Sequence, residues 1–139
     1  MTRFAKVVVV VALIVTPVLV WSVPAQAATI TASPSSVAVG GQVTLSGDVL
    51  ADGQPGCTVP GEVTLISQAF NGLGEFAGVG AVTVPVDAAG NFATTVTLPA
   101  TTTPGTYEIS GRCGGGNLGV TATLIVVGGT VSVPPPFTG

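Results

Sequence analysis

Basic side chains are scarce in this chain, and histidine is absent from it. Its 139 residues hold three Lys or Arg and six Asp or Glu. Arg3 and Lys6 stand close to the start, which leaves Arg112 as the only base in the rest of the sequence. Without histidine or lysine there, a serine nucleophile has no usual general base, and one arginine cannot neutralise nucleic-acid phosphates. We therefore expect no enzyme, no cofactor and no nucleic-acid partner.

Acidic residues are also few, and two kinds of site could use them. A pair of carboxylates would suit glycoside hydrolysis, and Asp48 with Asp52 would suit calcium, which takes about 6–8 oxygen ligands. Asp87 is better explained by a turn, and Asp48 and Asp52 by a polar loop that has no further carboxylate before Glu62. We predict no catalytic residue and no metal ligand.

The start of the chain has the pattern of a signal peptide. Arg3 and Lys6 precede an uncharged, almost wholly apolar run over 7–23, and Ala25-Gln26-Ala27 follows it. Signal peptidase recognises this order of basic region, apolar region and small-x-small site. We predict a signal peptide over 1–27, cleaved between Ala27 and Ala28, and a secreted, extracellular protein.

A membrane anchor is the alternative interpretation of the same leader. A spanning helix needs roughly 20 apolar residues, and the run over 7–23 is shorter and contains Pro17. The first cysteine is distant, so a lipoprotein signal does not fit either. We expect no membrane span in the chain that remains after cleavage.

Residues 28–139 have the length of one domain of about 100–150 residues. Apolar and β-branched residues alternate with polar ones, which is typical of half-buried strands, and no run suits an amphipathic helix. We predict a domain over 28–127 and a Gly/Pro-rich tail over 128–139. The strands expected are Thr29–Ser33 continued by Val37–Val39, then Gln42–Val49, Glu62–Gln68, Ala81–Val86, Phe92–Leu98, Tyr107–Cys113 and Leu118–Val127.

About seven short strands with frequent turn signals predict an all-β, immunoglobulin-like Greek-key β-sandwich. An up-and-down barrel is the alternative, and the unequal connections favour the sandwich. Asp87–Asn91 is expected to be a hairpin turn in which Gly90 takes a positive φ. Phe70–Gly80 is interrupted by glycines, and we interpret it as a flexible or bulged edge crossing. Pro85 suits an edge position.

Cys57 and Cys113 are the only cysteines. An even count in a small exported domain indicates a disulfide, worth about 4 kcal/mol for a loop of this length in the chain-entropy model. In the predicted sandwich, Cys57 precedes the third main strand and Cys113 ends the sixth. These two strands are antiparallel neighbours in such a fold. The bridge should therefore hold one end of a single sheet and should not cross the core.

Three segments carry a resemblance to a known group of proteins. Ala28–Gly47, Asp87–Phe92 and Pro104–Ile109 resemble segments of the immunoglobulin-like domains found in exported actinobacterial proteins, and the likeness extends over 28–127. Such domains serve as spacers, adhesion modules and binding modules. The resemblance implies a non-catalytic secreted or cell-surface module with a structural, adhesion or recognition role, whose partner is an extracellular protein or glycan.

The opening segment is also similar to that of the neocarzinostatin-like apoproteins, which carry small apolar ligands. That family has two short-loop disulfides, whereas this sequence offers one long loop. The similarity implies an alternative function, an extracellular carrier of a small ligand. Its cleft is expected near Phe70–Gly80 and the glycine-rich tip Gly114–Gly116.

The tail contains Pro134-Pro135-Pro136 and ends in a short motif. The last five residues resemble the sortase signal Leu-Pro-x-Thr-Gly, with Pro135 in place of the leucine. In that family the bond after the threonine is cut and the threonine is joined to the cell wall. The resemblance implies a cut between Thr138 and Gly139 and attachment to the wall, with release into the medium as the alternative.

Overall fold

The computed structural model describes residues 17–20, 28–49, 57–114 and 116–129. The predicted cleavage residue Ala27, Asp52 and the sortase-like pair Thr138 and Gly139 lie outside these ranges, as does most of the predicted leader. Within the described ranges no helix is both long and apolar enough to span a membrane.

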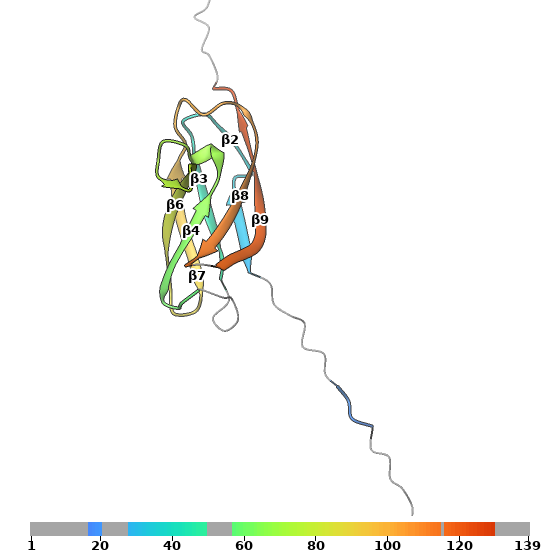
Figure 1. The fold of residues 1–139 in the computed structure, drawn as a ribbon. Helices are drawn as coiled ribbons and strands as arrows, with labels where there is room; N and C mark the ends of the chain where they lie inside the picture. The colour runs from blue at the N-terminus through green and yellow to red at the C-terminus, as the bar shows by residue number, and fades with distance from the viewer. Residues whose placement is uncertain (1–16, 21–27, 50–56, 115, 130–139) are drawn as a thin grey trace, which may run out of the picture.

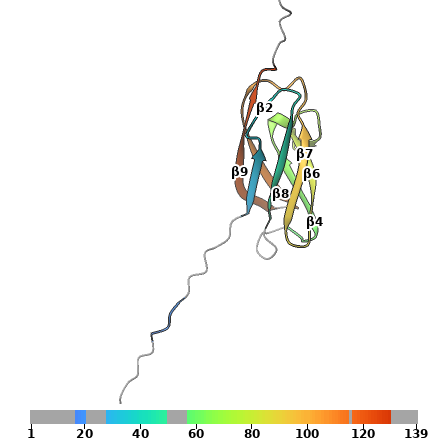
Figure 2. The same ribbon diagram turned by 180° about the vertical axis from the view of Figure 1, so that it is seen from behind.

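Two sheets face each other and form a sandwich, which confirms the predicted all-β fold (Figures 1 and 2). The smaller sheet has the strand order β1-β3-β7, and the larger has the order β2-β9-β8-β4-β6-β5. The strands of the smaller sheet are β1 (Thr29–Ser33), β3 (Gln42–Asp48) and β7 (Asn91–Thr97). Those of the larger are β2 (Ser36–Ala38), β4 (Gly61–Ile66), β5 (Glu75–Phe76), β6 (Val79–Val86), β8 (Gly105–Cys113) and β9 (Gly116–Val127).

The order of the strands is that of an immunoglobulin-type sandwich. Strands β1, β3 and β7 correspond to the first, second and fifth predicted strands, and they form the smaller sheet. Strands β4, β8 and β9 correspond to the third, sixth and seventh, and they lie side by side in the larger sheet. The Tyr107 hydroxyl donates a hydrogen bond to the carbonyl of Thr103. Such a tyrosine corner, at the start of the sixth strand, is a hallmark of this Greek-key topology.

The core lies between the sheets and is made by alternate residues of each strand. In β4, Val63 and Leu65 are buried while Glu62 is exposed, and in β8 Ile109 is buried while Glu108 is exposed. Because one face of each sheet meets the other sheet, the period-2 pattern of the sequence fixes which face is inside. The largest fully buried side chains are Phe70, Leu45, Leu65, Leu98, Ile109 and Leu124.

The described residues form nine strands, two more than expected, and the first extra one arises at Pro34. There the chain leaves the smaller sheet after β1 and joins the larger one as β2, which runs parallel to β9. The Ile125 N–H donates to the Ser35 carbonyl at 2.8 Å, and the Val39 N–H donates to the Val127 carbonyl at 3.0 Å. The first predicted strand therefore belongs to both sheets.

The second extra strand corrects the prediction for Phe70–Gly80. Instead of a flexible crossing, this segment completes a 3₁₀ helix, η1 (Gln68–Phe70), and then forms the hairpin β5–β6. Phe70 is fully buried in the core. The strand predicted to reach Gln68 ends at Ile66, because the buried hydroxyl of Ser67 accepts a hydrogen bond from the Ala69 N–H and caps η1.

The turn predicted between β6 and β7 is confirmed. Gly90 has a φ of +89°, and the Asp87 carboxylate accepts hydrogen bonds from the N–H groups of Ala89 and Asn91, both at 2.9 Å. Pro85 lies opposite Glu62 of β4, but its backbone nitrogen faces the other side of β6, where β5 pairs only with Val79 and Gly80. It therefore occupies an edge position, as expected.

Candidate binding surface

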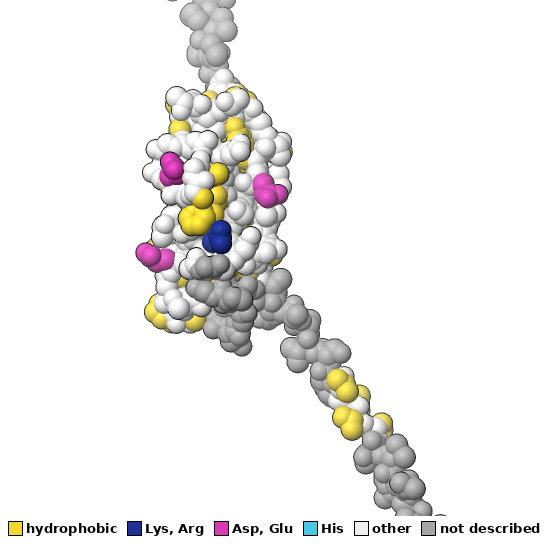
Figure 3. All heavy atoms as spheres, in the orientation of Figure 1, with side chains coloured by type: hydrophobic (Ala, Val, Ile, Leu, Met, Phe, Trp, Pro, Cys, Tyr) yellow, Lys and Arg dark blue, Asp and Glu magenta, His cyan; other side chains and the backbone are white. Residues whose placement is uncertain are grey.

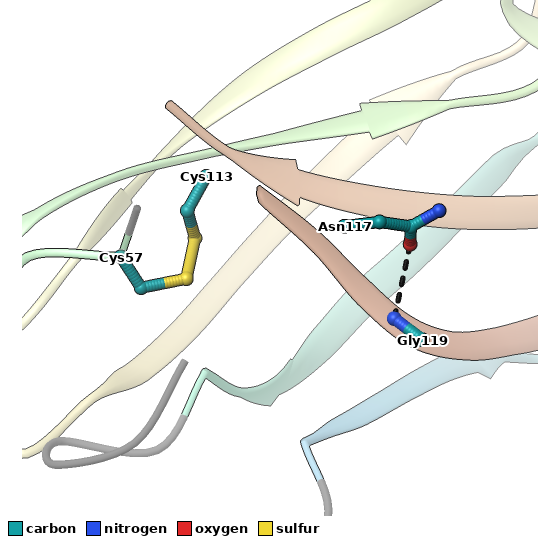
Figure 4. Close-up of a disulfide and its surroundings, with 4 residues drawn as sticks. All are labelled: Cys57, Cys113, Asn117 and Gly119. Carbon is teal, nitrogen blue, oxygen red and sulfur yellow. Dashed lines mark hydrogen bonds between the residues drawn. A yellow bond between two sulfur atoms is a disulfide. The ribbon is translucent and has the colours of Figure 1, made fainter. Parts of the chain in front are cut away.

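The disulfide joins Cys57 to Cys113, with the two Cα atoms 4.7 Å apart (Figure 4). Cys57 precedes β4 and Cys113 ends β8, and these strands pair antiparallel in the larger sheet. The start of one strand thus lies beside the end of the other. The predicted pairing and its place at one end of a single sheet are both confirmed.

The glycine-rich tip next to the disulfide is a short turn between β8 and β9. Its described part shows Gly114 with a φ of +54°. Just after it, the Asn117 side chain accepts a hydrogen bond from the Gly119 N–H at 3.0 Å (Figure 4). The ladder between β8 and β9 changes register between Ser110 and Arg112, and a bulge therefore separates the tip from the regular part of the sheet.

Hydrophobic side chains gather on the outer face of the larger sheet, beside the only described base (Figure 3). We call Ile66, Phe76, Val79 and Arg112 the outer patch. Phe76 pairs with Val79 across the β5–β6 hairpin, and each of the four is half-buried. Acidic side chains surround the patch in Figure 3. On a surface otherwise rich in threonine and serine, the outer patch is where an aromatic ring and a guanidinium meet.

Arg112 lies across the ring of Phe76, with the guanidinium carbon 5.2 Å from the ring centroid. A guanidinium within about 6 Å of an aromatic face is attracted by the ring quadrupole, by about 0.5–1 kcal/mol at an exposed site. Arg112 belongs to β8 and Phe76 to β5, the last strand of the sheet. The contact therefore holds the β5–β6 hairpin down against the sheet face.

Two backbone features fix the hairpin that carries Phe76. Ala77 and Gly78 form a two-residue turn with φ values of +51° and +83°, the sign pattern of a type I′ turn. Glycine and asparagine prefer these positions, and an alanine there costs about 1–2 kcal/mol. At the other side, the Asn71 side chain accepts a hydrogen bond from the Gly80 N–H at 2.8 Å. The position of the ring is thus fixed by the fold.

A shallow hollow of about 270 Å³ adjoins the outer patch. Ile66 and Val79 line it together with polar groups from η1 and β8. Its polar lining consists of Ser67, Gln68, Thr106, Tyr107, Glu108 and Ser110. Apolar contact area and hydrogen-bonding groups therefore lie next to each other on this face.

A larger, open groove of about 630 Å³ runs along the edge of the sandwich between β6 and β7. We call it the edge groove. Leu73–Phe76, part of the segment near which a cleft is expected, lies at its rim. Its lining includes five threonines, whereas sites for small apolar ligands are mainly hydrophobic and enclose most of the ligand. The described part of the glycine-rich tip does not line it.

Within the described residues, no three His, Cys, Asp or Glu side chains come together as a metal site. Asp87 serves the β6–β7 turn through its two hydrogen bonds. Asp48 lies at the end of β3, opposite Thr29 and Asn91 in the neighbouring strands. The turn expected at Asp87 is confirmed, whereas Asp48 lies in a paired strand and not in the polar loop expected for it.

The sequence alone does not indicate that Phe76 and Arg112 lie next to each other. Phe76 stands in a glycine-interrupted segment that gives no clear period, and the sequence around Arg112 does not indicate which side chain it contacts. The Phe76-Ala77-Gly78-Val79 run could have indicated a two-residue hairpin, but alanine is not a residue that such a turn favours.

Comparison with known proteins identifies neither a family nor a function for the chain. No protein-family model and no curated protein matches the chain. Among solved structures, the Pseudomonas fluorescens alkylpurine DNA glycosylase AlkC, bound to DNA containing an abasic site analog, matches at 14% identity and a TM-score of 0.48. The match covers 72% of this chain and 30% of that one.

Two further structures match with lower TM-scores. A β-glucosidase from Listeria innocua in complex with gluconolactone matches at 13% identity and a TM-score of 0.38, over 73% of this chain and 16% of that one. The bacterial hydrophobin BslA matches at 18% identity and a TM-score of 0.41, over 73% and 96%. The chain spans less than a third of the first two proteins, and none of the three likenesses indicates what it binds.

Proposed function

We propose that this protein is a non-catalytic, exported immunoglobulin-like module that acts in adhesion or recognition outside the cell. The signal-peptide pattern and the disulfide support export, since disulfides persist in oxidising compartments. The absence of histidine from the sequence, and of lysine after Lys6, supports a role without turnover.

The outer patch is the single observation that carries the recognition role. Aromatic residues and arginine are enriched where protein partners bind, and they supply much of the binding energy there. Phe76 and Arg112 are held in contact on the face of the larger sheet, with Val79 beside Phe76. We favour a protein partner over a glycan, because apolar side chains with an aromatic ring and an arginine among them are typical of protein interfaces.

Binding of the exported protein to surface proteins and wall glycans of the cells that produce it tests this proposal. Val79→Glu should abolish binding, because it places a carboxylate in the outer patch. Ile125→Glu is the matched control: Ile125 is 44% exposed on β9 of the same sheet, away from the patch. Equal binding by both variants, or binding to glycan alone, would contradict recognition of a protein through this patch.

Attachment to the cell wall is a further part of the proposal, supported by the similarity of the tail to a sortase signal. Protein released from cells only by a murein hydrolase would support it. Protein found wholly in the medium would contradict attachment while leaving the recognition role intact. Hydrolytic activity that is lost on replacement of a single carboxylate would contradict the non-catalytic role itself.

Carriage of a small ligand is the second candidate function, and the edge groove is the observation that favours it. The exported protein, purified from its native source, should then hold a small molecule detectable by mass spectrometry under native conditions. Leu73→Ser, at the groove rim, should reduce its retention. A protein that purifies without any ligand would argue against carriage.

A further inference from the structure

The hydrogen bonds between β3 and β7 show which way the backbone of β7 faces. The Leu98 N–H donates to the Gly41 carbonyl, and at the other end the Val49 N–H donates to the Gly90 carbonyl, both at 2.9 Å. Pairs that exchange hydrogen bonds alternate with pairs that do not in an antiparallel ladder. The even-numbered residues of β7 therefore bond to β3.

The odd-numbered residues of β7 consequently direct their N–H and C=O groups away from β3. Among the described strands, none pairs with that side of β7. The groups that face outward belong to Ala93, Thr95 and Thr97. The carbonyl of Asn91 faces the same way and already accepts a hydrogen bond from the Asp87 N–H at 2.9 Å. Three consecutive outward positions thus remain for another strand.

This edge lacks the features that normally prevent pairing with another chain. Exposed edges usually carry a charge, a proline or a bulge, and Asn91–Thr97 has neither a charge nor a proline. The nearby edge of β6 differs, because Pro85 has no N–H and the Ala81 N–H is bonded to the Gly74 carbonyl at 3.0 Å. The edge groove leaves space beside β7, since Thr94–Thr97 line it.

We propose that β7 pairs antiparallel with β7 of a second copy of this chain, about a two-fold axis at Thr95. In this register Thr95 faces Thr95 of the other copy, and Ala93 faces Thr97. The outward N–H and C=O groups of Ala93, Thr95 and Thr97 then bond to the same groups of the other copy. Asn91, whose carbonyl already accepts a hydrogen bond, lies beyond the paired segment. The same surface serves both copies, as a two-fold interface requires. The two small sheets become one continuous sheet.

The β7 edge itself presents a second copy with a strand that carries no charge, because Asn91–Thr97 contains no acid and no base. The sequence after the predicted leader holds six acids and one base, so two copies should repel each other over most of their surfaces. The described acids near this edge are Asp48 and Asp87, at the Asn91 end of β7, and Glu75, which lines the edge groove opposite Thr94–Thr97. Antiparallel pairing about Thr95 separates the two Asn91 ends by about 27 Å, since a strand rises about 3.4 Å per residue. Threonine pairs facing each other across strands are favourable.

Paired charge substitutions at position 95 test the inference. Thr95 is exposed on the outer face of the smaller sheet, so that a charged side chain there leaves the core unchanged. Sedimentation of the exported protein should show a dimer that increases with concentration. Thr95→Lys and Thr95→Glu should each lose the dimer, because like charges then meet at the axis. An equimolar mixture of the two variants should restore it as a heterodimer.

Thr31 provides the matched control, because it is exposed on β1 of the same sheet, separated from β7 by β3. Thr31→Lys and Thr31→Glu should dimerise as the unaltered protein does. A protein that is monomeric at every concentration, dimers that survive Thr95→Lys, or a mixture that stays monomeric would each overturn the inference. Binding through the outer patch is measured separately with Val79→Glu, so that either proposal can fail without the other.

Discussion

The hydroxyl of Tyr107 donates a hydrogen bond to the backbone carbonyl of Thr103, four residues earlier in the chain. This bond ties the start of β8 to the connection from β7, where the chain crosses from the smaller sheet to the larger one. Tyr107→Phe removes the donor and should lower the free energy of unfolding by about 0.5–1.5 kcal/mol. Urea denaturation followed by circular dichroism measures the change.

The control for Tyr107→Phe is Thr44→Val. The Thr44 hydroxyl lies 3.2 Å from that of Thr95 on an exposed face, and its loss should cost little because water replaces the contact. A Tyr107→Phe variant as stable as the unaltered protein would show that the corner contributes nothing to stability.

Gly47 in β3 has no room for a side chain. A Cβ atom there would clash with the Thr29 carbonyl oxygen and would lie 2.7 Å from the ring of Phe92. Gly47→Ala should destabilise the domain by about 1–3 kcal/mol, as overpacking typically does. Gly105→Ala is the matched control, because its Cβ would meet nothing closer than Tyr107 at 3.9 Å. Thermal unfolding of both variants should separate them clearly, and equal stabilities would refute this packing.

The substitutions Ala77→Gly and Ala89→Gly should change the free energy of unfolding in opposite directions. Ala77 has a φ of +51°, which an alanine adopts only at a cost, so Ala77→Gly should raise the free energy of unfolding by up to about 1 kcal/mol. Ala89, in the β6–β7 turn, is not among the residues with positive φ. Ala89→Gly should therefore lower stability by about 0.4–1 kcal/mol through the unfolded chain. Two variants that shift in the same direction would contradict the type I′ turn.

Removal of the disulfide should weaken the domain without changing its topology. The double variant Cys57→Ser, Cys113→Ser should lose about 2–4 kcal/mol of stability, because the unfolded chain gains freedom. Urea denaturation gives the loss, and nuclear magnetic resonance spectra show whether the strands remain. Free thiols in the unaltered exported protein would contradict the bridge.

The intact mass of the exported protein tests the predicted leader. Cleavage between Ala27 and Ala28, with one disulfide, should leave residues 28–139 less two hydrogens. Attachment through the sortase-like motif would remove Gly139 as well. A mass that includes residues 1–27 would refute cleavage at this site.

Much of the fold could be predicted from the sequence, because alternation along a strand directly reflects which face is buried. The faces of β8 and β9 and the turn at Asp87–Asn91 follow from local patterns. The structure of the Phe70–Gly80 segment could not be predicted from such local patterns. Phe70 is buried by tertiary packing, and the β5–β6 hairpin depends on Ala77 adopting a conformation that its residue type disfavours.

The candidate site was less predictable than the fold for the same reason. Arg112 and Phe76 lie far apart in the sequence, and their contact depends on the register of β4, β6 and β8 together. No periodicity within one strand encodes such a contact. The disulfide could be predicted because the sequence has two cysteines and therefore one possible pairing within the chain. No knowledge of long-range geometry was needed for it.

The parallel pairing of β2 with β9 gives the domain a defined response to mechanical force. The chain enters near Ala28 and leaves near Gly129 at opposite poles of the sandwich (Figures 1 and 2). Tension between these ends pulls β2 and β9 along their lengths in opposite directions. The bonds from Ile125 to Ser35 and from Val39 to Val127 are then loaded in shear and must break together, not one after another. A domain loaded in this direction resists extension until the hydrogen bonds between β2 and β9 break together.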